Sequence, residues 1–394
     1  MEALGGQTLE IVPPRVDPGA SLQFQGEPPS HWLPADFDRL LVWGADLGMS
    51  DLLLRPGTAI WIRLHGRWAV VSRRPVSTDE ILSLLDSMTR NVSSSAILKG
   101  GEDQDFAYEI QVDRFTRKRF RVNATACSDG WSVGGSLVLR TIPSIPVEIS
   151  TLNLEPEILA AAFPNNGLVL VTGTMGSGKS TLLSSTLRHI CETQPRFIQT
   201  YESPIEFDLT SIPNAKGPVV QTEIPTHLAD FSRAPRNSAR RATDVILFGE
   251  SRDEETLRGM IEAAEIGATA YSTVHTRSVS ETPARIINVF PADLQKQMAS
   301  TLLSSLRLIV HQRLLPKVGG GRIALREFLV FDAGLRDTLF RAEIDNLIPV
   351  VQEMVEAHGQ SLLRDAKSKL DQGLIEQEEY LKIVHEREVI HAMA

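Results

Sequence analysis

Hydrophobic and polar positions follow different periodicities in the two halves of the chain. In the first half, turn residues separate three stretches rich in β-branched or aromatic residues: QDFAYEIQV, RKRFRVNATAC and WSVGGSLVLRTI. Helical spacing occurs in FDRLLVWGADLG and at residues 78–90, where Thr78 is the expected N-cap. This pattern predicts a small, sensor-like (PAS-like) α+β domain with an antiparallel sheet over residues 33–141.

The segments on either side of this domain lack regular spacing. Residues 1–32 are rich in Pro, Gly and Gln, which predicts a mobile N-terminal arm. TIPSIPVEIS holds two prolines within ten residues. We therefore expect residues 142–150 to form a linker.

The second half contains short apolar runs that end in polar residues: GLVLVTG, RFIQTYES, DVILFGE and ATAYSTVH. Helical stretches at residues 179–191 and 254–266 lie between them. Alternation of this kind predicts an α/β domain over residues 151–343. Its sheet should be largely parallel, with the chemistry at the carboxyl ends of the strands.

The remainder of the chain is mostly helical. We expect a long amphipathic helix at residues 293–309, followed by a hairpin that turns at Gly319–Gly321. From Ile344, two or three polar amphipathic helices are expected to form a helical C-terminal region, residues 344–394.

Composition and charge limit the possible partners. With 394 residues, 42% hydrophobic and 23% charged, the chain has the composition of a soluble two-domain protein. A net charge of −9 argues against nucleic acid as a specific partner, so the basic stretches RFTRKRFR and RNSARRA are interpreted as nucleotide-facing or solvated surfaces. The two cysteines, Cys127 and Cys191, exclude a disulfide framework. The sequence lacks a signal peptide and any run of about eighteen apolar residues, so we expect a cytoplasmic protein that spans no membrane.

GTMGSGKS, residues 173–180, matches the phosphate-loop pattern G-x-x-x-x-G-K-[ST], with an apolar strand before it and a helix after it. Backbone N–H groups of such a loop point at phosphate oxygens, while Lys179 reaches the β- and γ-phosphates and Ser180 binds Mg²⁺. A fortuitous glycine-rich turn is the structural alternative. The sequence predicts a site for ATP and Mg²⁺, with these nucleotide-binding residues: Gly173, Thr174, Met175, Gly176, Ser177, Gly178, Lys179, Ser180 and Thr181.

An acid closes the buried strand in DVILFGE. Glu250 follows four apolar residues and lies downstream of the phosphate loop in the same α/β unit. A carboxylate there can meet the magnesium ion or orient the attacking water, so Glu250 is the candidate catalytic base. A surface Glu at the end of an ordinary buried strand is the structural alternative.

GTMGSGKST, YESPIEF, DVILFGESRDEET and STVHT, in this order, resemble the secretion ATPases that power type II secretion, type IV pili and type IV secretion. The resemblance runs from about residue 36 to residue 385. TYESPIEF, VVQTEIPTHLADF and RRATDVILFGESRD are similar to the DotB-like ATPases of type IVB (Dot/Icm) secretion and to their conjugative-plasmid counterparts. The resemblance implies a RecA-like P-loop nucleotide domain after the α+β N-domain.

This resemblance also implies roles for further residues. Glu202 matches the acid of the family's Asp box, which faces the γ-phosphate and helps to hold water and Mg²⁺, whereas Glu206 would be structural. The implied metal ligands are therefore Ser180, Glu202 and Glu250. His275, in the His box STVHT, would sense the γ-phosphate through a hydrogen bond; a core histidine with satisfied hydrogen bonds is the alternative.

Arginines are the remaining candidates for catalysis. Arg121 and Arg140, in RFRVN and LRTIP, match family N-domain arginines that close over the nucleotide. An arginine that neutralises the transferring phosphoryl group raises rates by roughly 10³–10⁵ in other phosphoryl-transfer enzymes. Arg240 is a third candidate, acting at a subunit boundary. For each of them the structural alternative is a surface ion pair worth under about 1 kcal/mol.

By resemblance, the chain is expected to be a homo-hexameric, Mg-dependent ATPase that powers type IVB secretion or conjugative transfer. Motion of the N-domain against the nucleotide domain would carry the work. The resemblance further implies peripheral recruitment to an inner-membrane secretion complex through a DotO-like ATPase.

Three other functions stay open. A type IV pilus retraction motor would place the same enzyme in another machine, although Ser203 and the EIPTHL stretch argue against it. A nucleotide-binding hexameric scaffold with little hydrolysis is left open by Ala268, where the family often has a histidine, and by Thr174 and Met175, where it usually has Pro-Thr. A DNA-translocating motor would need a basic channel.

Overall fold

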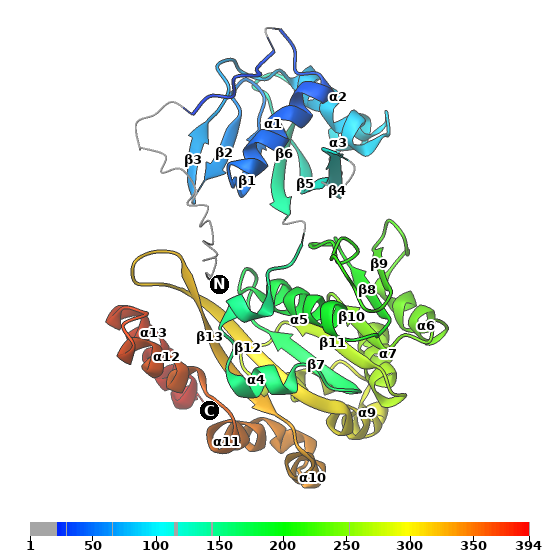
Figure 1. The fold of residues 1–394 in the computed structure, drawn as a ribbon, viewed down its shortest axis with the longest axis vertical. Helices are drawn as coiled ribbons and strands as arrows, with labels where there is room; N and C mark the ends of the chain where they lie inside the picture. Colours follow the sequence, from blue (N-terminus) through cyan, green and yellow to red (C-terminus); the bar gives the residue numbers. More distant parts are fainter. Residues whose placement is uncertain are drawn as a thin grey trace, which may run out of the picture. The chain divides into compact units, whose positions relative to one another are not determined.

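The computed structural model describes residues 22–393 except residues 29, 65, 114–116, 143–144 and 252, and it describes no side chain after Glu386. The chain divides into two compact units, Met1–Ser144 and Ile145–Ala394. Each unit is built around its own sheet (Figure 1).

The N-terminal arm expected over residues 1–32 lies outside the described residues as far as residue 21. After that point the backbone N–H of Phe24 donates to the carbonyl of Val71 at 2.9 Å. The Phe24 ring packs on Trp32 and Trp43, with centroid separations of 6.1 and 5.4 Å. Phe24 and Trp32 are thus buried in the core of the first unit, so these two residues are held to it.

The first unit is a six-stranded sheet with helices packed on it. Its strand order is β3-β2-β1-β6-β5-β4, and neighbouring strands are antiparallel. The predicted antiparallel α+β arrangement is confirmed. Its elements are α1 (Pro34–Asp46), β1 (Asp51–Leu54), β2 (Trp61–Leu64), β3 (Arg67–Val70), α2 (Thr78–Thr89), α3 (Ser94–Lys99), β4 (Gln104–Gln111), β5 (Arg117–Ser128) and β6 (Val133–Ile142).

The N-cap of α2 is Ser77, so the prediction of Thr78 was wrong by one residue. The hydroxyl of Ser77 accepts from the backbone N–H of Glu80 at 3.2 Å, and the Glu80 carboxylate accepts from the Ser77 N–H at 2.8 Å. This reciprocal capping box requires an acid three residues after the cap, and Glu80 stands at that distance from Ser77.

The two faces of this sheet differ in chemistry, because successive side chains of a strand point to opposite sides. On one face, Leu52, Val122 and Leu139 pack with residues of α1 and α2 in a buried core. The opposite face carries a row of side chains that are partners in register on β3, β2, β1, β6 and β5: Trp68, Arg63, Asp51, Arg140 and Arg121.

The second unit contains a seven-stranded sheet in the order β13-β12-β7-β11-β10-β8-β9. All neighbouring strands are parallel except β12 and β13, which form an antiparallel hairpin. The predicted largely parallel sheet is confirmed. Its strands are β7 (Gly167–Thr172), β8 (Ile198–Glu202), β9 (Val219–Glu223), β10 (Val245–Phe248), β11 (Thr269–Val274), β12 (Leu306–Pro316) and β13 (Arg322–Val330).

Helices cover both faces of this sheet, which explains why β7, β8, β10 and β11 are buried at every position. One face packs on α5, the other on α7, α9 and α11. The helical elements are η1 (Ile149–Leu152), α4 (Pro156–Ala161), α5 (Lys179–Thr193), η2 (Phe231–Arg233), α6 (Ala234–Ala239), α7 (Glu254–Glu265), α8 (Glu281–Ile287), α9 (Ala292–Ser305), α10 (Ala333–Arg341), η3 (Ile344–Asn346), α11 (Leu347–His358), α12 (Leu362–Asp371) and α13 (Gln377–Met393).

The helix expected at residues 293–309 ends early, at Ser305. Residues 306–309 instead begin β12, because Leu306, Leu308 and Ile309 pair with β7 in the sheet. Tertiary pairing thus overrides a helical pattern at this boundary. The predicted hairpin turn is confirmed: Gly319, Gly320 and Gly321 all have positive φ. Among the described residues, no helix has the length and apolar character required to cross a membrane.

Candidate nucleotide site

The phosphate loop joins β7 to α5 and is closed by glycines in the left-handed region. Gly173, Gly176 and Gly178 have φ values of 138°, 76° and 85°, conformations that side-chain-bearing residues rarely adopt. Gly173 also has no room for a side chain, since a Cβ atom would lie 2.3 Å from the carbonyl oxygen of Gln312. Thr174, Met175 and Gly176 are exposed at the tip of the loop.

Lys179 folds back onto its own loop. Its Nζ donates to the carbonyl oxygens of Gly173 at 2.9 Å and Thr174 at 2.8 Å. Burial lowers the pKa of this ammonium group, and the negative charges of Glu250 and Glu206 oppose that effect. A phosphate oxygen could therefore replace the two carbonyl groups as the acceptor. Ser180 and Thr181 follow in the first turn of α5, both partly exposed.

Glu202 and Glu250 are brought together because β8 and β10 are neighbours and end at the same edge of the sheet. The backbone N–H of Gly249 donates to the carbonyl of Tyr201 at 2.8 Å. A Cβ atom at Gly249 would lie 3.1 Å from that carbonyl oxygen and 3.3 Å from the Cα of Glu202. The absence of a side chain at Gly249 thus allows the two strand ends to approach closely.

The carboxyl group of Glu202 is buried and held by two donors. The hydroxyl of Thr200 donates to its Oε1 at 2.6 Å, and the amide of Gln221 on β9 donates to the same atom at 3.1 Å. Burial nevertheless raises the pKa of Glu202 to about 7, since these hydrogen bonds compensate only part of the lost hydration. Glu202 therefore exchanges a proton near neutral pH.

Glu250 meets His275 at the ends of β10 and β11. The His275 Nε2 lies 2.9 Å from Glu250 Oε1, and the side chains are 40% and 28% exposed. The hydroxyl of Thr273 donates to the carbonyl of Gly249 at 2.7 Å, which fixes the backbone next to the acid. Glu250 is thus solvent-accessible and oriented by an imidazole, an arrangement suited to hold a water molecule.

Two of the three candidate arginines belong to the first unit and one to the second. Arg121 and Arg140 are direct cross-strand partners on β5 and β6 of the first unit. Arg121 Nη2 donates to Asp105 at 2.6 Å, and Arg140 Nε donates to Asp51 at 2.9 Å. Arg240 follows α6 in the second unit and is exposed. The structure therefore pairs Arg121 with Arg140 and places Arg240 at a surface.

Sequence reasoning missed two polar side chains that support the site. Gln221 holds Glu202, and Gln312 on β12 donates through Nε2 to the carbonyl of Ser177 in the phosphate loop at 2.7 Å. The stretch IVHQRLL did contain a signal, because two hydrogen-bonding residues, His311 and Gln312, precede Arg313 in the middle of an apolar run. Both are buried, and buried polar groups must find partners.

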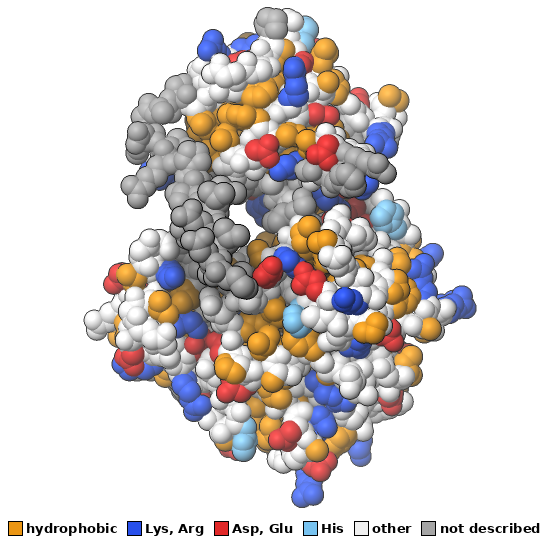
Figure 2. All heavy atoms as spheres, in the orientation of Figure 1, with side chains coloured by type: hydrophobic (Ala, Val, Ile, Leu, Met, Phe, Trp, Pro, Cys, Tyr) orange, Lys and Arg blue, Asp and Glu red, His pale blue; other side chains and the backbone are white. Residues whose placement is uncertain are grey.

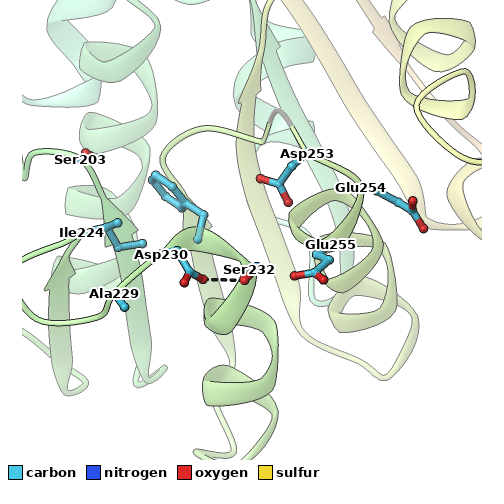
Figure 3. A pocket seen from close by; sticks show the side chains of 9 residues that line it. Ser203, Ile224, Ala229, Asp230, Ser232, Asp253, Glu254 and Glu255 are labelled. Carbon is cyan, nitrogen blue, oxygen red and sulfur yellow. Dashed lines mark hydrogen bonds between the residues drawn. The ribbon is translucent and has the colours of Figure 1, made fainter.

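A separate pocket lies beside the ends of β8 and β9 and has a volume of about 610 Å³. Figure 3 shows its acidic side chains, including Asp230, which accepts a hydrogen bond from Ser232, and Asp253 and Glu255 at the start of α7. No phosphate-loop residue is among the described residues that line it. Its carboxylates would repel phosphate, and the described residues that line it include no lysine or arginine to offset that repulsion, unlike Lys179 at the phosphate loop.

Comparison with known proteins identifies relatives over most of the chain. A family model described as "Type II/IV secretion system protein" matches residues 102–320. The type IV pilus retractation ATPase PilT of Pseudomonas aeruginosa is 33% identical over 343 residues, which cover 87% of this chain and 96% of that protein. A twitching motility protein of Neisseria gonorrhoeae is 34% identical over 315 residues, covering 80% of this chain and 81% of that protein.

Two solved structures have the same fold. The X-ray structure of the Legionella pneumophila ATPase DotB has a TM-score of 0.81 and 37% identity, covering 93% of this chain and all of that one (100%). The crystal structure of the pilus retraction motor PilT with bound ADP has a TM-score of 0.77 and 29% identity, covering 88% of this chain and 96% of that one.

Proposed function

This chain belongs to the family of type II/IV secretion system proteins and is therefore an ATP hydrolase, and we propose that it is the hexameric, Mg-dependent ATPase that powers type IVB secretion or conjugative transfer. The expected family and fold, a RecA-like nucleotide domain with a smaller α+β N-domain and a helical C-terminal region, are confirmed. The observation that carries the proposal is the meeting of Glu202, Glu250 and His275 at the carboxyl edge of the sheet that also bears the phosphate loop.

The geometry supports separate roles for two residues: Lys179 binds phosphate and Glu250 activates the attacking water. Lys179 would exchange the carbonyl groups of Gly173 and Thr174 for phosphate oxygens, which leaves its burial unchanged. Glu250 would hold the attacking water and accept its proton, while His275 keeps the carboxylate in place. Because water is the nucleophile, cleavage would release ADP and inorganic phosphate.

The residues at this edge fit a magnesium ion bound through the nucleotide. Mg²⁺ prefers oxygen ligands and uses few of them from the protein when phosphates are present, which suits the Ser180 hydroxyl and the carboxylates of Glu202 and Glu250. The negative charges of Glu250 and Glu206 act on Lys179, and that of Glu206 also acts on Glu202, so this edge carries negative charge that a cation would stabilise. When bound, Mg²⁺ would neutralise charge on the β- and γ-phosphates.

The choice of a type IVB or conjugative machine is supported by the DotB structure, which is 37% identical, whereas the PilT structure is 29% identical. A pilus retraction motor is the second candidate, because retraction ATPases are 33–34% identical over most of the chain. Restoring effector secretion in a strain that lacks its DotB-like ATPase, but not twitching in one that lacks PilT, would favour the first. The reverse result would favour the second.

Arginines supply the argument for a ring. Arg121 and Arg140 form one cationic pair on the first unit, and Arg240 is exposed on the second. In a homo-hexamer Arg240 would face a neighbouring subunit, and Arg121 and Arg140 would close over the nucleotide. Charged side chains of both signs are interspersed on the face in Figure 2, which suits protein partners better than a nucleic-acid track. The ring would dock from the cytoplasm on a DotO-like ATPase at the inner membrane.

Steady-state ATP hydrolysis over a roughly hundredfold range of protein concentration tests the proposal. We expect turnover per subunit to rise with concentration as rings assemble, and to be lost in Lys179→Ala. Turnover that does not depend on concentration would contradict sites completed by assembly. Background turnover in the wild type, with ADP bound tightly, would favour a nucleotide-binding scaffold, for which buried Ala268 in place of a histidine is the supporting observation.

A further inference from the structure

Gln312, a buried residue of the β12–β13 hairpin, contacts the phosphate loop. Gln312 is 3% exposed and donates through Nε2 to the carbonyl of Ser177 at 2.7 Å. Added Cβ atoms at Gly173 and Gly178 would lie 2.3 Å from the backbone oxygen and 2.8 Å from the Nε2 of Gln312. Two of the three glycines of the loop, Gly173 and Gly178, are therefore packed too closely against Gln312 to carry a side chain.

Arg326 continues the chain of hydrogen bonds into β13. It is the register partner of Gln312, and its Nε donates to Gln312 Oε1 at 2.9 Å. The remaining guanidinium nitrogens donate to the carbonyls of Leu152 at 2.9 Å and Asn153 at 3.1 Å, and to the carboxylate of Glu155 at 3.1 Å. With its side chain 4% exposed, Arg326 can have only one orientation that satisfies all these acceptors.

This series of hydrogen bonds ends at helix α12, which packs against β13 (Figure 1). The backbone N–H of Arg326 donates to Asp365 of α12 at 2.8 Å. Asp365 also pairs with Lys369, and Lys369 lies 3.8 Å from Glu155. Two cations and two carboxylates thus lie in one cluster, and displacement of α12 would break both the hydrogen bond from Arg326 to Asp365 and the contact between Lys369 and Glu155.

We propose that Gln312 positions the phosphate loop for nucleotide and that Arg326 couples this position to helix α12, so that nucleotide binding and docking of α12 stabilise each other. The inference rests on the proposed nucleotide site. Neither side chain needs to touch the nucleotide, because Gln312 acts through the carbonyl of Ser177. Reciprocity follows from linkage: a docked α12 that favours nucleotide is itself favoured by nucleotide.

Gln312→Glu tests the first half of the proposal. A carboxylate still accepts from Arg326 but cannot donate to the Ser177 carbonyl, so the link to the loop is lost while the link to Arg326 is kept. We expect the Kd for Mg–ADP, measured by calorimetry, to rise about tenfold, and KM for ATP to rise more than kcat falls. A Kd equal to that of the wild type would overturn the positioning role.

Gln199→Glu is the matched control. Gln199 is fully buried on β8, donates to the Thr200 carbonyl and the Thr222 hydroxyl, and accepts from Arg241. The variant makes the same change from amide to carboxylate, at a residue that does not contact the phosphate loop. We expect it to lose stability but to keep the wild-type Kd; an equal rise in Kd in both variants would overturn the proposal, because the effect would then be general destabilisation.

Amide hydrogen exchange in α12 tests the coupling. Mg–ADP should slow exchange of the α12 amides in the wild type but not in Gln312→Glu. Asp365→Asn tests the coupling from helix α12. The asparagine keeps an acceptor for the Arg326 N–H but removes the negative charge that pairs with Lys369, so the Kd for Mg–ADP should rise about threefold. Unchanged exchange in the wild type on binding, or an unchanged Kd in Asp365→Asn, would overturn the coupling. Failure of the wild type to bind ADP would instead overturn the nucleotide site itself.

Discussion

The ends of β8 and β10 both present a glutamate to the candidate site, yet their surroundings are opposite. Glu202 is buried and held by Thr200 and Gln221, and its pKa is raised to about 7. Glu250 is partly exposed and pairs with His275 at 2.9 Å. One chemical group is thus made a buried, proton-exchanging acid at one strand end and a solvent-facing, oriented carboxylate at the next. Environment rather than residue type separates their roles.

Replacing the exposed acid should have the largest effect. In Glu250→Gln the amide cannot accept a proton from water, so we expect kcat to fall by roughly 10²–10⁴ while the Kd for ADP stays near the wild-type value. Single-turnover hydrolysis and calorimetry provide the two numbers. Glu254→Gln, an acid on α7 that pairs with Arg258, is the control; equal losses in both variants would remove the special role of Glu250.

Replacing the buried acid should change stability as well as turnover. The pKa of Glu202 is about 7 in the folded chain and 4.5 in the reference state. The stability that Glu202 contributes to the folded chain is therefore fully present below pH 4.5 and is lost as the pH rises through 7. Relative to the wild type, Glu202→Gln should gain stability over this interval, by on the order of 3 kcal/mol.

Denaturant unfolding at several pH values between 4.5 and 8 measures this gain, and turnover of the same variant at saturating Mg–ATP should fall by about tenfold to a hundredfold if Glu202 helps to hold Mg²⁺ and water. A stability difference that does not vary with pH would show that Glu202 titrates normally. Full turnover would reduce Glu202 to a structural residue.

Removing Gln221, which donates a hydrogen bond to Glu202, should increase the difference between Glu202 and Glu250. In Gln221→Leu the ionised carboxylate loses a hydrogen bond, so the pKa of Glu202 should rise above about 7. The acid limb of the pH–kcat profile should then move to higher pH by about one pH unit. An acid limb that stays in place would mean that it reports another group.

The smallest effect is expected from Glu206→Gln. The negative charge of Glu206 raises the pKa of both Glu202 and Lys179. Its removal should move the same acid limb to lower pH, by less than about half a pH unit, because the group is partly exposed and screened. Shifts of the same sign in Gln221→Leu and Glu206→Gln would contradict the electrostatic account.

The sequence predicts the parts of this site that depend on local pattern. The phosphate loop is contiguous, and Glu202, Glu250 and His275 each lie at or just after the end of a strand, so parallel pairing is enough to gather them at one edge. Gln312 could not be placed from the sequence, because its partner Ser177 lies 135 residues away. The early end of α9 has the same cause: pairing of β12 with β7 decides the boundary, and no local rule reports it.

The paired arginines of the first unit carry a consequence for reversibility. Arg121 is held by Asp105 and Arg140 by Asp51, so both have acidic partners before any anion arrives. A ligand that drew these guanidinium groups away would strand two aspartates, and the attraction between the separated charges would oppose the move. Release of such a ligand would therefore restore the two ion pairs without any further input.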